Sequence, residues 1–354
     1  MYHPRPPGHV PLLPDAPISA VQPSAKTDLQ AQSLPPLRVS YEHARADQVL
    51  AQPDVLAVLG FGPGVVAVDD ARFLRVCLAP IGDAPLEVWR TRAPVRSGFD
   101  GDIRWSSDDN YLFFAIEVDE QAAGGADAAA ERAYRDIAGL LARQRLAGGV
   151  QAQVLRLWNY LDAINDGIGD DERYRHFCSG RARGIVESAR NGFSAATAIG
   201  RRDGVRVLQV YGLAARLAGI AVENPRQLSA WRYPREYGPT APTFARATRT
   251  AADQLLVSGT AAVVGHASQH GGDTLAQIDE TLINLDHLLE AAGAECAQRG
   301  ASTMMLKAYV RDGADASAVA ASIRARHPDL GGLLLLAGDI CRRELRVEVD
   351  GIQG

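Results

Sequence analysis

One pattern of apolar residues occurs twice, once in each half of the chain. Residues 133–141 (AYRDIAGLL) and 281–289 (TLINLDHLL) share the spacing of their apolar residues, so that Ile137 aligns with Leu285. The spacing is typical of an amphipathic helix, and a strand-like run follows each helix. Repeated units of this kind often bury a common face. The pattern therefore predicts two tandem strands–helix–strand–helix–strand units, with a chance match as the alternative because helix–strand pairs are common.

Two such units imply an α+β fold in which mixed sheets pack on helices. Short runs rich in Val, Leu and aromatic residues predict strands at 37–41, 55–60, 73–78, 86–90, 111–118, 154–160, 205–211, 255–259, 261–265, 303–310, 333–336 and 345–349. Helices are expected at 126–144, from about 172 onward, at 273–293 and at 315–326. The predicted organisation is a Pro-rich tail at 1–36, an N-terminal unit at 37–225, an ordered linker at 226–242 and a C-terminal unit at 243–354.

Composition excludes several classes of function. The formal net charge is −5 and no basic stripe is present, which gives no support for binding nucleic acid or a membrane. The four cysteines are widely spaced, and a Gly-Gly loop follows His266 and His270, so we expect no metal site and no disulfide framework. Residues 60–64 (GFGPG) lack the spacing of a dinucleotide loop, and no cofactor is predicted. Without a signal peptide or a membrane-spanning run, the chain is predicted to be cytoplasmic.

The segment 337–352 (AGDICRRELRVEVDGI) contains the strongest candidate for an acid. Apolar and charged residues alternate from 345 to 350, as in a strand with one apolar and one charged face. In one interpretation the charged face, with Glu348, is exposed to water, as most Glu side chains are. In the other, a second part of the chain covers this face. Glu348 would then be a carboxyl group with a raised pKa that can donate a proton.

Several motifs resemble known families. Residues 255–293, 306–312 and 345–352 resemble the small trimeric RidA/YjgF proteins. From about 37 to 352 the chain resembles the chorismatases. The motifs that carry this resemblance are WNYLDAIN at 158–165, ERYRHFCSGRARG at 172–184, NPRQ at 224–227, YPREYGP at 233–239 and GDICR at 338–342. The resemblance implies tandem RidA/YjgF-like (chorismate-mutase-like) units in one chain, with 243–354 as the C-terminal one and the site in the cleft between them.

The resemblance to chorismatases also implies a reaction. Members cleave chorismate and release pyruvate without a metal or cofactor, and the family's acid matches Glu348. A cysteine matching Cys341 marks members that form 3-hydroxybenzoate, and members without it form a dihydroxycyclohexadiene carboxylate. Some cysteine-bearing members also form 4-hydroxybenzoate for pigment and quinone (ubiquinone) pathways, so the product ratio stays open. Leu333 stands where imine-hydrolysing RidA proteins have an arginine, and a non-catalytic ligand-binding protein is the alternative.

The chemistry of chorismate indicates what the site must supply. Cleavage of the enol ether needs a proton on the methylene carbon, and a protonated carboxyl in a dry cleft can supply it. The two carboxylates need cations or donors, and the ring needs apolar or aromatic neighbours. The predicted substrate-binding residues are Arg235, Tyr237, Arg246, Arg181, Tyr211, Tyr233, Gly259 and Ala261. Structural ion pairs and core packing are the alternative roles for these arginines and aromatics. Chorismate is the expected partner of a monomer or weak oligomer.

Overall fold

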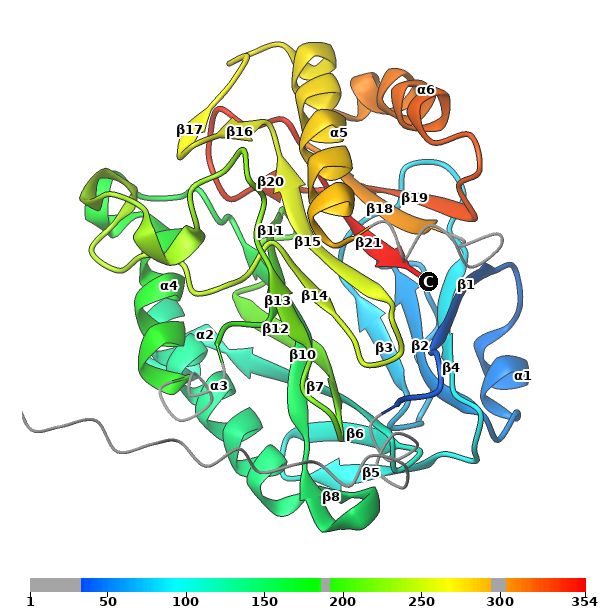
Figure 1. Cartoon of the computed structure of the whole chain (residues 1–354). Coiled ribbons are helices and arrows are strands. Elements are labelled where there is room, and N and C mark those ends of the chain that lie inside the picture. Colours follow the sequence, from blue (N-terminus) through cyan, green and yellow to red (C-terminus); the bar gives the residue numbers. More distant parts are fainter. Residues whose placement is uncertain (1–32, 186–191, 294–303) are drawn as a thin grey trace, which may run out of the picture. The chain divides into compact units, whose positions relative to one another are not determined.

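Three mixed β-sheets dominate the computed structural model, which describes residues 33–185, 192–293 and 304–354 (Figure 1). The first sheet has the strand order β1-β4-β2-β3. Its elements are β1 (Arg38–Glu42), α1 (Ala46–Leu50), β2 (Val55–Phe61), β3 (Phe73–Val76) and β4 (Leu86–Arg90).

The second sheet has the strand order β20-β11-β10-β12-β7-β6-β5. Its strands are β5 (Arg96–Asp100), β6 (Ile103–Ser107), β7 (Tyr111–Asp119), β10 (Gln153–Asp162), β11 (Ala195–Arg201), β12 (Val207–Ala215) and β20 (Asp339–Ile340). The helices of this part of the chain are α2 (Glu120–Ala123), α3 (Ala126–Arg143) and α4 (Arg173–Gly184), and a small ribbon consists of β8 (Arg145–Leu146) and β9 (Val150–Gln151).

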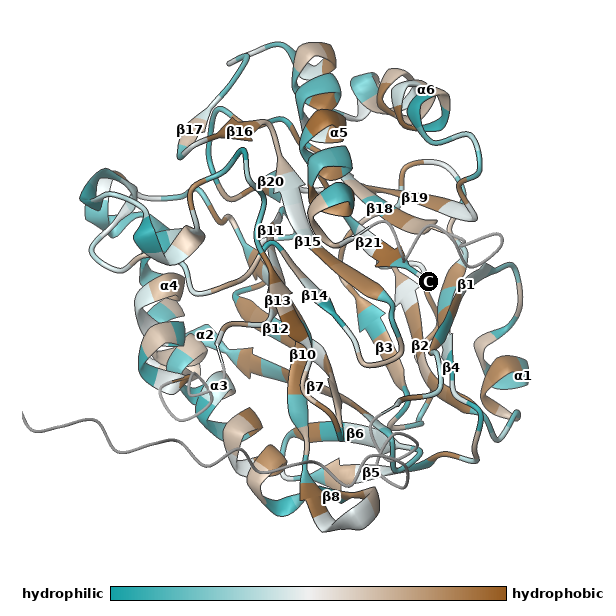
Figure 2. Ribbon diagram, viewed as in Figure 1, coloured by the Kyte–Doolittle hydropathy of each residue, from teal (hydrophilic) through white to brown (hydrophobic). Residues whose placement is uncertain are grey.

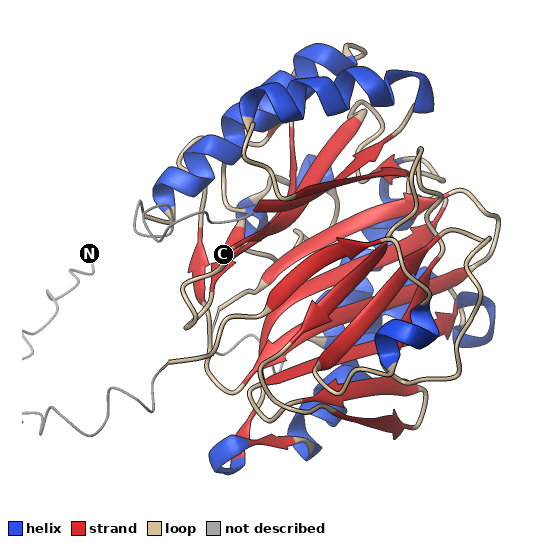
Figure 3. Ribbon diagram, turned by 90° about the vertical axis from the view of Figure 1, so that its right-hand side faces the viewer, coloured by secondary structure: helices blue, strands red, loops and turns tan. Residues whose placement is uncertain are grey.

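The third sheet has the strand order β13-β14-β15-β21-β18-β19. Its strands are β13 (Ile220–Val222), β14 (Ala247–Arg249), β15 (Leu255–Ala261), β18 (Met304–Val310), β19 (Gly332–Ala337) and β21 (Val347–Gln353). Helices α5 (Thr274–Ala291) and α6 (Ala316–Arg326) pack side by side, and β16 (Val263–Val264) pairs with β17 (Ala267–Ser268) (Figure 3). β15 runs without interruption through 260, where the sequence predicted a break between two strands.

The repeat predicted from sequence is confirmed by the topology. In chain order, the strands β7, β10, β11 and β12 lie in the sheet as first-fourth-second-third, and so do β15, β18, β19 and β21. In both sets the second and third strands are parallel and the fourth is antiparallel to its neighbours. A helix follows the first strand of each set and another follows the second. The α+β fold with two tandem units is therefore observed.

The first sheet has the same strand order and directions, which sequence analysis missed. Its helix α1 has only five residues and no second helix separates β2 from β3, so this unit lacks the amphipathic helices that revealed the other two. Residues Leu34–Gly354 form one compact unit that contains all three sheets. Most of the predicted tail lies outside the described residues. We propose that residues 226–242 link the two longer repeats, 37–225 and 243–354.

Helices cover the outer face of each sheet, and the inner faces of the three sheets share a core. Leu255, Val347 and Val349 pack against α5 side chains in one outer core. α5 begins where the Asp273 side chain accepts a hydrogen bond from the Ala276 backbone N–H, which caps the helix. Hydrophobic colouring is concentrated on the strands, whereas helices such as α3 and α5 carry both hydrophobic and hydrophilic colouring (Figure 2). Among the described residues, no helix is both long and apolar enough to cross a bilayer.

Ion pairs tie the inner faces of the sheets together. Nζ of Lys307 on β18 lies 3.1 Å from Oε2 of Glu87 on β4, and Nη2 of Arg156 on β10 lies 3.2 Å from Oδ2 of Asp350 on β21. All four side chains are buried. The same Asp350 oxygen accepts hydrogen bonds from Trp158 Nε1 at 3.0 Å, Thr197 Oγ1 at 2.9 Å and Tyr309 OH at 2.9 Å. These contacts compensate for the burial of the Asp350 side chain, because buried charged groups are stable only when paired and hydrogen-bonded.

Candidate active site

Glu348 is the second residue of β21 and is covered by the second sheet. Its neighbours Val347 and Val349 point into the core under α5, so the alternation of the strand turns Glu348 to the inner face. β21 is flanked by β15 and β18, and Glu348 pairs with Ala261 and Tyr309 on these strands. Only 4% of Glu348 is exposed. The interpretation in which the charged face of this strand meets water is therefore wrong.

Burial raises the pKa of Glu348 from the ordinary 4.5 to about 8. The negative charge of Asp350 also raises this pKa, whereas the positive charges of Arg156 and Arg246 lower it. Among the described residues, none donates a hydrogen bond to the Glu348 carboxyl group, which lines a cavity. At neutral pH the Glu348 carboxyl group is therefore protonated and faces the cavity, which is the state required of a general acid.

The cavity has a volume of about 310 Å³ and lies between the third sheet, the start of α4, the segment 227–246 and the loop 341–345. Its floor is formed by Glu348, Gly259 and Ala261, and Tyr174 and Phe244 form part of its wall. The other lining residues are Glu172, Arg175, Gln227, Tyr233, Glu236, Tyr237, Pro242, Arg246, Val263, Cys341, Arg342, Arg343, Glu344 and Leu345. A cavity of this size, with aromatic walls and several cations, fits a small anionic ring compound.

Cys341 faces the same cavity from the loop between β20 and β21. Burial raises the pKa of its thiol, and the nearby Glu348 raises it further, so the thiol stays neutral. Tyr174 on α4 lies near both groups. Burial is the main cause that raises the pKa of Tyr174, and Cys178, Cys341 and Glu348 raise it further. A neutral thiol is a weak nucleophile but can orient a substrate or shape its surroundings.

Arg246 provides a cation whose side chain is buried at the cavity wall. It precedes β14 and is 5% exposed. Its Nη2 donates hydrogen bonds to Leu228 O at 2.8 Å and Tyr233 OH at 2.7 Å, and its buried Nε has no hydrogen-bond partner within the described parts of the chain. A buried N–H that lacks a partner costs free energy unless a ligand accepts from it. Arg246 is therefore suited to binding a carboxylate.

Arg342 provides a second cation at the cavity. Its guanidinium carbon lies 4.0 Å from the centroid of the Tyr237 ring and 5.0 Å from that of Tyr233. Its Nη1 donates to His266 O at 2.8 Å, and the Tyr237 hydroxyl lies 3.1 Å from His266 Nδ1. These contacts hold the guanidinium over two rings, so that it is positioned before a ligand arrives.

Three of the predicted substrate-binding residues lie elsewhere. Arg235 is exposed and pairs with Asp170, with nitrogen–oxygen distances of 2.9 and 2.6 Å. Arg181 is buried on α4, with its guanidinium carbon 5.1 Å from the centroid of the Tyr134 ring. Tyr211 is fully buried in the central core. The five others, Tyr233, Tyr237, Arg246, Gly259 and Ala261, line the cavity.

Tyr174, Phe244 and Arg342 line the cavity and were not identified as binding residues. Tyr174 and Arg342 lie within the motifs that resemble chorismatases, so these motifs were an available signal for them. Phe244 lies outside those motifs, between the linker and β14, and only the packing of the two sheets places it at the cavity.

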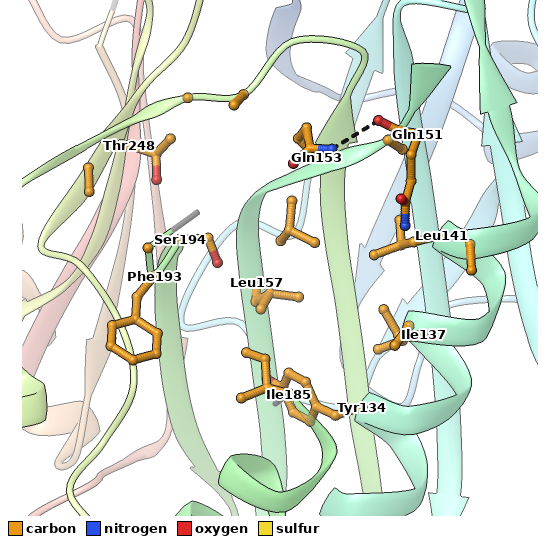
Figure 4. Close-up of a pocket in the computed structure, with 18 residues that line it drawn as sticks. Tyr134, Ile137, Leu141, Gln151, Gln153, Leu157, Ile185, Phe193, Ser194 and Thr248 are labelled. Atoms are coloured by element: carbon orange, nitrogen blue, oxygen red, sulfur yellow. Dashed lines mark hydrogen bonds between the residues drawn. The ribbon is translucent and has the colours of Figure 1, made fainter. Parts of the chain in front are cut away.

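A larger cavity of about 510 Å³ lies between α3 and the start of β10 (Figure 4). Ile137, Leu141 and Leu157 form much of its surface, with Gln151 and Gln153 at one side. Its lining contains no Arg, Lys, Asp or Glu among the described residues. The described part of its lining therefore offers neither a cation for a dianion nor a carboxyl acid.

The described residues contain no group of three or more His, Cys, Asp and Glu side chains arranged to hold a metal ion. His266 and His270, which are four residues apart, have different partners. His266 contacts Tyr237, whereas Nε2 of His270 lies 3.3 Å from Oε2 of Glu280.

Known proteins are similar to this chain in sequence and in fold. The family model "Chorismatase FkbO/Hyg5-like, N-terminal" matches residues 87–214. A "3-hydroxybenzoate synthase" of Streptomyces hygroscopicus is 36% identical over 293 residues, which cover 78% of this chain and 83% of that protein. A "Chorismatase" of the same organism is 34% identical over 330 residues, which cover 88% and 93%. A crystal structure of a chorismatase matches with a TM-score of 0.75 and 33% identity, covering 91% of this chain and 99% of that one. The chain belongs to the chorismatase family.

Proposed function

We propose that this protein cleaves chorismate to pyruvate and a hydroxybenzoate. The observation that carries the proposal is the buried Glu348, whose raised pKa of about 8 keeps a proton at the cavity. Relatives that are 34% to 36% identical bear the names chorismatase and 3-hydroxybenzoate synthase. Chorismate contains one enol ether, and an acid in this position can protonate its methylene carbon.

The reaction begins when the Glu348 proton forms a C–H bond at the methylene carbon, which leaves an oxocarbenium ion on the adjacent carbon. The oxygen of the neighbouring ring hydroxyl then bonds to the ring carbon that carries the ether, as the bond from that carbon to the ether oxygen breaks. The ether oxygen becomes the keto oxygen of pyruvate, and the hydroxyl proton returns to the Glu348 carboxylate. The three-membered ring of this arene-oxide-like intermediate opens at one C–O bond, its oxygen gains a proton and the six-membered ring loses a C–H proton, so that the six-membered ring becomes aromatic. One chorismate gives one pyruvate and one hydroxybenzoate, so no water is consumed and no electrons are exchanged. Capture by water instead would give a dihydroxycyclohexadiene carboxylate.

We assign substrate binding to five predicted residues that line the cavity, Arg246, Tyr233, Tyr237, Gly259 and Ala261, and add Arg342. Arg246 presents a free Nε and Arg342 a stacked guanidinium, so the two cations can pair with the two carboxylates. The neutral Cys341 thiol, on the same cavity, directs capture toward the internal hydroxyl. This assignment favours 3-hydroxybenzoate as the main product, with 4-hydroxybenzoate as a second product for pigment or quinone pathways.

We further propose that the protein works in the cytoplasm as a monomer or weak oligomer. Cys77, Cys178 and Cys341 are free thiols, which supports a reducing compartment.

The experiment is to incubate the purified protein with chorismate and to measure pyruvate, with chromatography of the aromatic products. We expect pyruvate and 3-hydroxybenzoate in equal amounts. Pyruvate accompanied only by the dihydroxy acid would indicate hydrolysis. If no pyruvate forms above the control without enzyme, the proposal is wrong and a ligand-binding protein is favoured.

A further inference from the structure

Cys341 is carried by a loop that crosses from one sheet to the other and back. The chain leaves the third sheet at the end of β19, pairs as β20 with β11 of the second sheet, and returns to the third sheet as β21. Ile340 pairs with Ile199 in this crossing. The position of the thiol over the cavity therefore depends on what holds residues 338–346.

One side chain, Arg311, binds this loop on both sides of Cys341. Nη2 of Arg311 donates to the backbone oxygens of Ile340 and Arg342, each at 3.1 Å, and Nε donates to Leu345 O at 2.8 Å. Because residues 340 and 342 flank the cysteine, both of its peptide neighbours are fixed by a single guanidinium. Arg311 directly follows β18, so the group is anchored in the third sheet.

The other contacts of Arg311 connect the loop to the second sheet. Its Nη1 pairs with Oδ1 of Asp339, and its Nη2 also donates to Oδ1 of Asn165 at 3.0 Å. Asn165 follows β10 and in turn donates from Nδ2 to Ile340 O at 3.1 Å. Only 18% of the Arg311 side chain is exposed. The planar guanidinium uses all three of its nitrogens, which an ammonium group at this place could not reproduce.

We propose that Arg311 is a positioning residue that fixes the Cys341 thiol over the cavity and thereby determines how the substrate ring is captured. The part that concerns capture rests on the proposed cleavage of chorismate. Arg311 does not line the cavity and touches no reacting atom. Its effect on the product must therefore pass through the loop that it binds.

The first test does not need a substrate. In Arg311→Lys the charge is kept but the bonds that bracket the cysteine are lost, so alkylation of Cys341 by iodoacetamide should become at least about fivefold faster, the effect of losing one such bond. Alkylation is followed by mass spectrometry of the Cys341 peptide, with Cys77 as the internal reference. The matched control is Arg202→Lys, because Arg202 is 47% exposed and pairs with the same Asp339 at 2.5 Å without contacting the loop carbonyls. An unchanged rate in folded Arg311→Lys, or an equal increase in Arg202→Lys, would overturn the proposal.

A second variant covers the case in which Arg311→Lys does not fold. Asn165→Ala removes the bond to Ile340 O and one acceptor of Arg311, and it leaves the Arg311–Asp339 pair in place. Alkylation of Cys341 should be faster in this variant than in the wild-type protein, as in Arg311→Lys. A folded Asn165→Ala protein with the wild-type rate would contradict the role of these contacts.

The second test measures products. With chorismate, Arg311→Lys should lower the hydroxybenzoate formed per pyruvate by about threefold or more, as for other directly coupled residues. In a Cys341→Ala background the same substitution should cause no further decrease, because its effect passes through the thiol. A further decrease in that background would overturn the proposal. If the wild-type protein releases no pyruvate, the proposed function fails, whereas the alkylation test still decides whether Arg311 positions Cys341.

Discussion

The carboxyl group of Glu348 occupies the space that a side chain at Gly259 would need. An ideal Cβ on Gly259 would lie 1.8 Å from Oε1 of Glu348 and 3.3 Å from Oγ1 of Thr197. The first distance is far below van der Waals contact, so residue 259 must lack a side chain for Glu348 to keep its position. The glycine is explained by this close approach, because no positive φ is recorded for it.

Gly259→Ala should therefore displace the acid. A shift of about 1 Å at a reacting group can lower a rate by about 10²-fold, and we expect pyruvate release to fall by about that factor. The control is Gly313→Ala, where a Cβ would meet nothing within 4 Å. Steady-state kinetics of both variants check the prediction, and wild-type kcat in Gly259→Ala would contradict it.

Glu348→Gln keeps the size of the side chain and removes the acidic proton. Pyruvate release should fall by at least ~10²-fold, the lower end of what a general acid contributes. Glu344→Gln is the matched control, because Glu344 lines the same cavity but is exposed and accepts a hydrogen bond from Ser268 Oγ. Undiminished pyruvate in Glu348→Gln would remove this residue from the mechanism.

The rate of pyruvate release should decrease as the pH rises through about 8, because Glu348 loses its proton there. The folded-state pKa lies above the ordinary 4.5, so the folded protein binds this proton more tightly. The corresponding stability is fully present below 4.5 and is lost as the pH rises through about 8. The pH profile of kcat, together with urea unfolding across this range, checks both statements. A rate that stays constant up to pH ~10 would contradict the assignment of Glu348 as the acid.

Asp350→Asn should move the midpoint of that profile to lower pH. The substitution removes the negative charge that raises the pKa of Glu348 and keeps an oxygen that can accept from Thr197 and Tyr309. Thermal unfolding of the variant shows whether it is folded. A midpoint that is unchanged, or that moves to higher pH in a folded variant, would contradict the electrostatic role of Asp350.

Cys341→Ala should separate the two halves of the reaction. The proton from Glu348 is delivered before the thiol acts, so pyruvate release should continue while hydroxybenzoate declines and the dihydroxy acid replaces it. Chromatography of a single reaction measures all three products. Equal losses of pyruvate and hydroxybenzoate would show that Cys341 and Glu348 do not have separate roles.

Substitutions of Arg246 and Arg235 should differ in their effect on KM for chorismate, although the sequence suggested both residues as substrate-binding. Arg246→Lys loses the planar group that can bind a carboxylate, and KM for chorismate should rise at least about tenfold, the lower range for a charged hydrogen bond. Arg235→Lys should leave KM unchanged, because Arg235 pairs with Asp170 at the surface. A larger effect on KM in Arg235→Lys would contradict the assignment.

The two longer units could be predicted from sequence because their helices leave a clear apolar period, as at Ile137 and Leu285. The shorter unit has no such helix, and β11 (AATAIGR) is too poor in large apolar residues to be recognised as a strand. Spacing shows which face of an element is apolar, but it does not show that a third sheet of the same topology completes the core.

For the site, Glu348 could be identified because apolar and charged residues alternate along β21, which places its charged residues on one face of the strand. Its environment could not be predicted, since Asp350, Arg156 and Arg246 come together only when two sheets pack. Arg235 was suggested by its motif, but motif membership does not distinguish a ligand from an ion pair such as the one with Asp170.

Because the three sheets belong to one chain, their contacts are encoded by different residues and can change independently. A ring of three identical chains would repeat each substitution at every contact. Here the cavity lined by Glu348 has a volume of about 310 Å³, whereas the cavity lined by Glu87 and Lys307 has a volume of about 20 Å³. The two contacts share Asp350, which lines the small cavity and whose charge raises the pKa of Glu348. Variants for higher thermal stability are therefore best sought among the residues of the small cavity other than Asp350 and its partner Lys307.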